Sequence, residues 1–191
     1  MLSFSEMLSA VRTYDSTVKS TVSRPQMLAY LIFLILSVSA ALPLQAAPKN
    51  VEAAFKKMMA LQGHWEGKDA DGNPVHTSFE PVVSGTALLE TLAPSGMEEM
   101  LTLYSVDGDG IQLAHYCPTN NQPRMRVVPS SPDPQELDFQ FTGAGNLPDI
   151  SVGHQHRLVI DFEDADHITE TWTWRQGNHD MPMVFHLARK Q

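Results

Sequence analysis

The stretch Ile111–Val127, IQLAHYCPTNNQPRMRV, reads as two strands and the loop that joins them. Because side chains alternate between the two faces of a strand, one face carries Ile111, Leu113, His115 and Cys117. That face begins apolar and ends with an imidazole and the only thiol of the chain. The loop and the second strand add polar residues that strand pairing does not require: Asn120, Asn121, Gln122, Arg124 and Arg126. We therefore expect this hairpin to line the mouth of a small cavity.

The period near two continues on both sides of the hairpin, with turn residues roughly every 8–12 positions, which is typical of an all-β domain. Pro118 and Pro123 are expected to interrupt the ladder on either side of the loop. We predict ten strands, with these bounds: His64–Lys68, Val75–Val82, Ala87–Leu92, Glu99–Ser105, Ile111–Cys117, Arg124–Val128, Glu136–Phe141, Gln155–Phe162, His167–Arg175 and Met183–Arg189.

One helix is predicted ahead of the strands, over Asn50–Leu61, because its apolar residues recur with a period near 3.6. Asn50 can cap its N-terminus, and Gly63 ends it. Ten short strands in up-and-down order favour a closed antiparallel barrel, since closure removes the sheet edges. A barrel of this size is wide enough to enclose a cavity.

The N-terminal part differs from the rest of the chain. An uncharged apolar run covers residues 27–44, with Arg12, Lys19 and Arg24 before it and Ala46 and Ala47 after it. This order is typical of a secretory signal peptide. Its length also permits an uncleaved membrane anchor. We predict a leader or anchor over residues 1–46 and a barrel domain over residues 47–191, in a periplasmic or secreted protein.

The charge and cysteine content narrow the function classes. The formal net charge is −9, which repels phosphate backbones and excludes nucleic acid as an expected partner. Cys117 is the single cysteine, so an internal disulfide cannot form, and an exported domain depends on its core. A membrane would be contacted only through an uncleaved N-terminal segment.

The residues Leu61–Gly67, LQGHWEG, contain Gly-x-Trp at the first strand of the predicted barrel. This motif resembles the calycin families, which include lipocalins, fatty-acid-binding proteins and nitrobindin-like barrels. The L-x-G-x-W-x-G form with ten strands is most similar to DUF1579-type and nitrobindin-like domains. The resemblance implies that Trp65 closes one end of the barrel beneath a late-strand cation, for which Arg189 is the candidate through a cation–π contact.

The resemblance to nitrobindin-like proteins implies one alternative function, haem binding through a histidine near the C-terminus. His186, followed by Leu187, is the matching residue, and redox or nitric-oxide chemistry would follow from it. The chain departs from that family after the tryptophan, where Lys68, Asp69 and Ala70 replace a further glycine and Tyr-Pro. DUF1579-type domains share the barrel pattern without an established haem role, and the chain resembles them more.

Several polar and aromatic residues are candidates for contact with a ligand. Inward-facing Arg124 or Arg126 would need a carboxylate, such as Glu90, Glu99 or Glu170, or a bound anion. The alternative is that both arginines face water. The predicted ligand-binding set is His115, Cys117, Arg124, Arg126, His156, Glu170, Trp172 and Trp174. His115 and Cys117 with His154 and His156 also have spacings that permit a metal site, although an ordinary polar network explains them better.

Catalysis has little support, because no G-x-S-x-G, H-E-x-x-H or phosphate-cradling glycine loop occurs. The sequence favours non-enzymatic binding of a small apolar or amphipathic ligand, without a cofactor. The alternatives are the haem protein described above and a structural envelope barrel filled by its own side chains.

Overall fold

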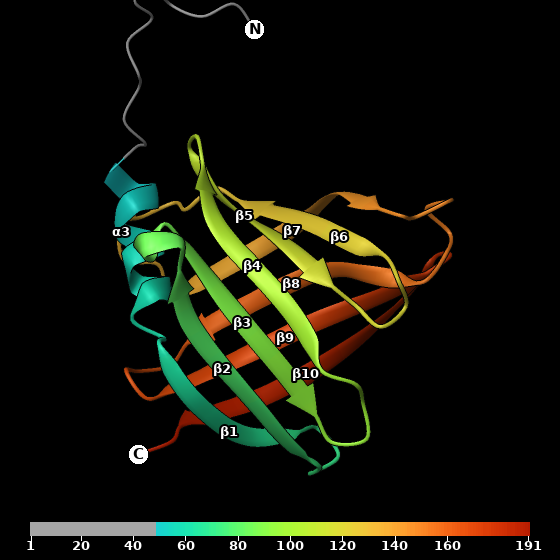
Figure 1. The fold of residues 1–191 in the computed structure, drawn as a ribbon, viewed down its shortest axis with the longest axis horizontal. Helices are drawn as coiled ribbons and strands as arrows, with labels where there is room; N and C mark the ends of the chain where they lie inside the picture. The colour runs from blue at the N-terminus through green and yellow to red at the C-terminus, as the bar shows by residue number, and fades with distance from the viewer. Residues whose placement is uncertain (1–48) are drawn as a thin grey trace, which may run out of the picture. The chain divides into compact units, whose positions relative to one another are not determined.

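The computed structural model describes residues 49–191, which form a closed barrel of ten antiparallel strands preceded by one helix (Figure 1). The predicted leader over residues 1–46 lies outside the described residues. Within residues 49–191, no helix is both long and apolar enough to cross a membrane. The predicted fold class is confirmed.

The helix and the ten strands lie close to their predicted positions. Their bounds are α3 (Lys49–Met59), β1 (Gly63–Asp69), β2 (Pro74–Val82), β3 (Ala87–Pro94), β4 (Met100–Asp107), β5 (Gly110–Tyr116), β6 (Gln122–Val127), β7 (Glu136–Gly145), β8 (His154–Phe162), β9 (His167–Gln176) and β10 (His179–Arg189), with a short 3-10 turn, η1 (Val83–Gly85), between β2 and β3. Each strand pairs with its neighbours in sequence, and β1 pairs with β10 to close the barrel.

Among the strands that extend beyond their predicted bounds, β6 and β10 do so through a proline. Pro123 lies inside β6 and Pro182 inside β10. Pro123 pairs with Ala144 of β7, but the pairing of β6 with β5 begins only at Arg124. Pro182 likewise pairs with β9, whereas β10 meets β1 only from Phe185 onward. Each proline therefore lies where its strand has one partner, so its missing N–H breaks no ladder.

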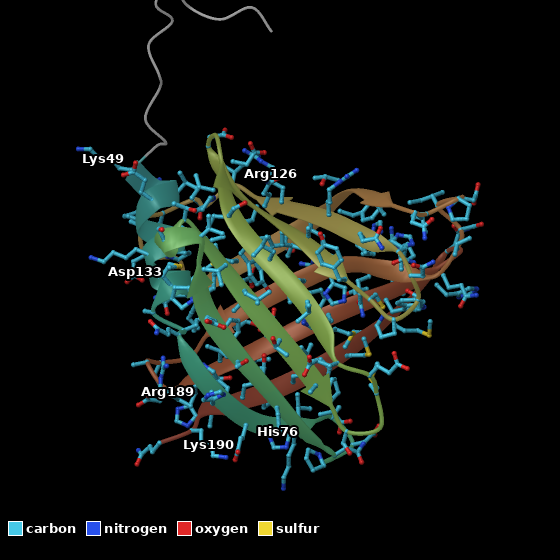
Figure 2. The ribbon with its side chains drawn as sticks, in the orientation of Figure 1. Lys49, His76, Arg126, Asp133, Arg189 and Lys190 are labelled. Atoms are coloured by element: carbon cyan, nitrogen blue, oxygen red, sulfur yellow. The ribbon has the colours of Figure 1, made fainter. Side chains whose placement is uncertain are left out.

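Helix α3 covers one end of the barrel, here called the closed end, while the β3–β4 and β5–β6 connections lie at the opposite, open end (Figure 1). The helix buries Val51, Ala54, Phe55 and Met58. Lys57 ties it to the β6–β7 connection, because its Nζ donates to Asp133 Oδ1 at 2.7 Å. Figure 2 shows Asp133 beside α3.

The closed end is held by the predicted contact between Trp65 and Arg189. The Arg189 guanidinium lies 4.4 Å from the Trp65 ring centre, and it donates to the backbone carbonyls of Gln62, Ala60 and Ala165. Trp65 itself is 1% exposed and donates its Nε1–H to the Leu61 carbonyl at 2.8 Å. The predicted Trp65–Arg189 contact is present, and it joins the end of α3, the start of β1 and the end of β10.

Gly67 in the same motif is required by close backbone approach. A Cβ atom at this position would lie 1.8 Å from the His186 carbonyl oxygen of β10. Any other residue would push β1 and β10 apart where they close the barrel. The second glycine of G-x-W-x-G is therefore a consequence of barrel closure.

We predict that Arg189→Met lowers the free energy of unfolding by about 3 kcal/mol, because it leaves three carbonyls without a charged donor and removes the cation over Trp65. Chemical denaturation measures this. The control is Lys190→Met, at the adjacent exposed residue, whose side chain pairs only with Glu66. It should change the free energy by less than about 0.5 kcal/mol. Equal effects of the two substitutions would contradict this role of Arg189.

Candidate functional site

The interior of the barrel contains a layer of polar side chains between two apolar parts. These residues come from inward positions on β2, β3, β4, β5 and β9, and all are 4% exposed or less: Thr77, Glu90, Thr102, Tyr104, His115 and Glu170. Sequence analysis selected His115 and Glu170 as ligand contacts and considered Glu90 only as a partner for arginine. Tyr104, Thr77 and Thr102 were missed.

Glu90 is held by a hydroxyl donor, because Tyr104 Oη donates to its Oε2 at 2.6 Å. Thr77 Oγ1 lies 3.5 Å from Glu90 Oε1 but closer to the Thr91 carbonyl, to which it donates at 3.0 Å. No cation accompanies the carboxyl group, so burial raises the pKa of Glu90 and the bond from Tyr104 only partly offsets this. Burial and the neighbouring carboxylates also raise the pKa of Tyr104 well above its ordinary value.

Glu170 lies on β9, next to the same group. Burial raises the pKa of Glu170 well above its ordinary value, and the negative charge of Glu90 raises it further. Trp172 Nε1 donates to Glu170 Oε2 at 3.1 Å, whereas Glu170 Oε1 has no hydrogen-bond partner among residues 49–191. Since an ionised carboxylate without a counter-ion is costly in the interior, burial favours the protonated form of Glu170.

His115 meets Trp172 across the barrel. Their ring centres are 4.6 Å apart, although three strands separate β5 from β9 in the barrel order. His115 Nδ1 shares a 2.9 Å hydrogen bond with Thr102 Oγ1, and His115 Nε2 has no partner within the described residues. Burial lowers the pKa of His115 to about 4, so the imidazole is neutral at pH 7.

A cavity of about 660 Å³ lies directly beyond this layer, at the open end of the barrel. It is mostly apolar, and its lining residues come from both sides of the opening: Met97, Glu98, Met100, Cys117, Pro118, Thr119, Gln155, Trp174, Met181 and Met183. Met100, Cys117 and Trp174 are two positions along their strands from Thr102, His115 and Trp172, so the polar layer lies one side-chain level deeper.

The structure brings five of the eight predicted ligand contacts into the interior. His115 and Glu170 belong to the polar layer, Trp172 contacts both of them, and Cys117 and Trp174 line the cavity. Cavity residues that sequence analysis missed are the four methionines and Gln155. Their position in the sequence could have identified them, since each lies at or near a strand end on the same side of the barrel.

Arg124 and Arg126 do not line the cavity, and the prediction that they do is wrong. Met125 occupies the inward position of β6, opposite Leu113 of β5, so both arginines face outward. Arg126 pairs with Asp107 and Asp109 of the β4–β5 hairpin. Figure 2 shows Arg126 beside that hairpin. Among residues 49–191, the inward carboxyl groups of Glu90 and Glu170 have no arginine partner and instead accept from the Tyr104 hydroxyl and the Trp172 indole N–H.

His156 also lies outside, contrary to prediction, because β8 is irregular. The register of β8 against β9 shifts between Gln155 and Arg157, which places Gln155 opposite Trp174 and turns His156 outward. His154 and His156 therefore do not converge with His115 and Cys117, and the metal arrangement that the spacings permitted is not formed by these four residues.

His154, which is buried, and the half-buried His156 belong to a directed chain of hydrogen bonds. Arg175, which is paired with Asp180, donates to His156 Nε2. His156 Nδ1 must then donate to His154 Nε2 at 3.0 Å, and His154 Nδ1 donates to the Val152 carbonyl at 2.7 Å. Burial first, and then the charge of Arg175, lowers the pKa of His156. The chain fastens the β7–β8 connection beside the cavity.

That connection touches the cavity wall at Gly153. A Cβ at Gly153 would lie 2.2 Å from Trp174 Cζ2, so only glycine allows the indole to lie there. Asn121 Nδ2 donates to the Gly153 carbonyl at 2.9 Å, which joins the β5–β6 and β7–β8 connections. The mouth is thus built by loops that hold one another.

His186, the candidate haem ligand, lies on the outer face of β10. Phe185 and Leu187 on either side of it are buried, whereas His186 is exposed and shares a hydrogen bond with Thr169 Oγ1 at 2.9 Å. A haem inside the barrel could not be ligated by this residue, so the arrangement does not fit the haem alternative.

Comparison with protein-family models and with curated proteins gives no match. Among solved structures, the chain is similar to "Crystal Structure of Rv2717c from M. tuberculosis", with 14% identity and a TM-score of 0.52, over 77% of this chain and 100% of the other. At this identity the similarity shows the fold alone. The fold is a closed ten-stranded antiparallel barrel.

The buried imidazole makes the stability of the fold depend on pH. The unfolded chain takes up a proton on His115 as the pH falls through 6.5, whereas the folded chain does so only near pH 4. As the pH is lowered from 6.5 to 4, the free energy of unfolding should therefore decrease, by up to about 3 kcal/mol from this group. Comparing wild type with His115→Gln by denaturation from pH 7 to pH 4 isolates the contribution of His115 to this pH dependence. His179→Gln, at an exposed histidine, is the control, and an identical slope in wild type and His115→Gln would contradict the assignment.

Glu170 should act in the opposite direction. Its folded-state pKa is raised, so the stabilisation it contributes below its ordinary pKa is lost as the pH rises through the folded value. Glu170→Gln keeps the shape and removes the ionisation. It should gain stability over wild type from pH 5 to pH 9, by up to about 1.4 kcal/mol for each pH unit of the window. Glu136→Gln, at an exposed position, should show no such trend. A constant difference between wild type and Glu170→Gln at all pH values would refute the raised pKa.

Proposed function

We propose that the protein is a non-enzymatic binder of a small, largely apolar ligand, which occupies the cavity at the open end of the barrel. The observation that carries this proposal is the cavity itself, about 660 Å³ in volume and lined by four methionines and Trp174. Ligand cavities have volumes of roughly 300–1,000 Å³, with mainly apolar walls and a few polar groups. The open-end cavity has this character.

The exposure of the rim supports a ligand over a purely structural role. Met97 is 50% exposed and Met181 47% exposed, and both line the mouth. Apolar side chains gathered at one opening lose contact with water when a ligand covers them. Methionine also adapts its shape to different partners, because its side chain is unbranched and flexible. A barrel filled by its own side chains would describe the closed half of this molecule but not the open half.

The finer parts of the proposal concern family and location. The L-x-G-x-W-x-G motif and the ten strands support a DUF1579-type relationship, and the apolar run over residues 27–44 supports export to the periplasm or beyond. Haem binding through His186 is not favoured, because that side chain lies outside the barrel and is bonded to Thr169.

Two experiments test ligand binding. Organic extraction of the purified protein followed by mass spectrometry should release an apolar compound that a denatured control lacks. The delipidated protein should then bind the neutral fluorophore N-phenyl-1-naphthylamine at a saturable site. Failure of both, no extracted compound and no saturable binding, would refute the proposal.

Substitution inside the cavity should weaken binding of the fluorophore. Met183→Gln places an amide against the ligand and should raise the dissociation constant about tenfold, since it removes apolar contact worth about 1–2 kcal/mol. The matched control is Met59→Gln, because Met59 packs against the core near the closed end, away from the cavity. Equal affinities for the wild type and Met183→Gln would place the bound fluorophore elsewhere.

A further inference from the structure

The cavity contains one buried polar side chain whose hydrogen-bonding capacity is unused. Gln155 is 2% exposed and lines the cavity opposite Trp174. Its Oε1 has no hydrogen-bond partner among residues 49–191. A buried acceptor without a donor is costly, so the site is complete only when another molecule donates to this oxygen.

The charged side chain at the cavity is that of Glu98, and its carboxylate is also a hydrogen-bond acceptor. Glu98 lies at the rim, on the β3–β4 connection, and is exposed. No lysine or arginine of the described residues is among the side chains that line the cavity. Arg124 is exposed, and the other four arginines of residues 49–191 pair with acids outside the cavity: Arg126 with Asp109, Arg157 with Asp138, Arg175 with Asp180 and Arg189 with Asp166.

This arrangement is unsuited to the carboxylate of a fatty acid. An anionic headgroup in the mouth would meet the carboxylate of Glu98 and would lack a cation among the lining residues. Carboxylates are usually held by arginine or by several N–H donors. The net charge of −9 adds a long-range repulsion of anions.

We infer that the ligand is a neutral or cationic amphiphile whose headgroup carries an N–H or O–H donor, and that fatty-acid anions are disfavoured. The donor bonds to Gln155 Oε1, and the apolar body packs on Trp174, Met100 and Met183. This inference rests on the proposed function and assigns Gln155 as the residue that determines specificity.

Four probes with a decyl or decanoyl chain separate the possible headgroups: decanol, decylamine, methyl decyl ether and decanoate. Titration of the full-length protein at pH 7.5, followed by tryptophan fluorescence, gives their affinities. Decanol and decylamine should bind at least about tenfold more tightly than decanoate. Decanol should bind about fivefold more tightly than the ether, which lacks a donor, as expected for one hydrogen bond.

Two variants assign the preference to residues. Gln155→Met has a similar shape without the amide and should abolish the difference between decanol and the ether. Gln140→Met, at an exposed residue on the outer face of β7, should leave that difference unchanged. Glu98→Gln should weaken decylamine and leave decanol unaffected. A thermal melt of each variant confirms that it folds.

The outcomes distinguish this inference from the proposed function. If none of the four probes binds, the proposed function fails and the inference fails with it. If all bind with equal affinity, or decanoate binds most tightly, the proposed function stands and the inference is overturned. A preference for decanol that persists unchanged in Gln155→Met would also overturn it.

Discussion

Closure of the barrel between β1 and β10 is the constraint on which the rest of the structure depends. The two strands come from opposite ends of the domain, and they meet closely enough that the His186 carbonyl occupies the space a side chain at residue 67 would need. Arg189 completes the closure, because its guanidinium covers Trp65 and bonds the carbonyls that follow α3. One end of the barrel is thereby sealed, and any opening to the interior must lie at the other.

As a result, the character of the interior changes along the barrel axis. Apolar side chains fill the closed half under α3. A polar layer follows, in which Glu90 accepts from the Tyr104 hydroxyl and Glu170 accepts from the Trp172 indole N–H. Beyond it the methionine-lined cavity opens. His115 and Trp172 join opposite walls of the barrel at the level where filled core gives way to open cavity.

The sequence predicted the elements of this fold well, because strand period and turn residues are local signals. The ten strands and the helix lie near their expected positions, and the Trp65–Arg189 contact follows from the motif and its family resemblance. The facing of His115 was also predictable, since it shares its strand face with Ile111 and Leu113. Glu90 could have been selected for the same reason, because Leu88 and Leu92 flank it at the same spacing.

Residues were assigned to the wrong face of the barrel where local spacing does not determine which way a side chain points. The irregular register between Gln155 and Arg157 exchanged His156 for Gln155 as the inward residue, and nothing in the spacing of the histidines reveals such a shift. Arg124 and Arg126 alternate with Met125, so the choice of inward face depended on a partner strand. The methionines of the cavity belong to segments far apart in sequence, and only barrel closure brings them together.

The central claim is that the open end of the barrel holds an apolar ligand, and methyl NMR of the methionines tests it most directly. In protein labelled at the methionine methyl groups, decanol should shift the signals of the cavity residues Met97, Met100, Met181 and Met183. Met58 and Met125, buried outside the cavity lining, should keep their chemical shifts. Uniform small shifts at all positions, or no saturable shift at the four cavity methionines, would contradict the account.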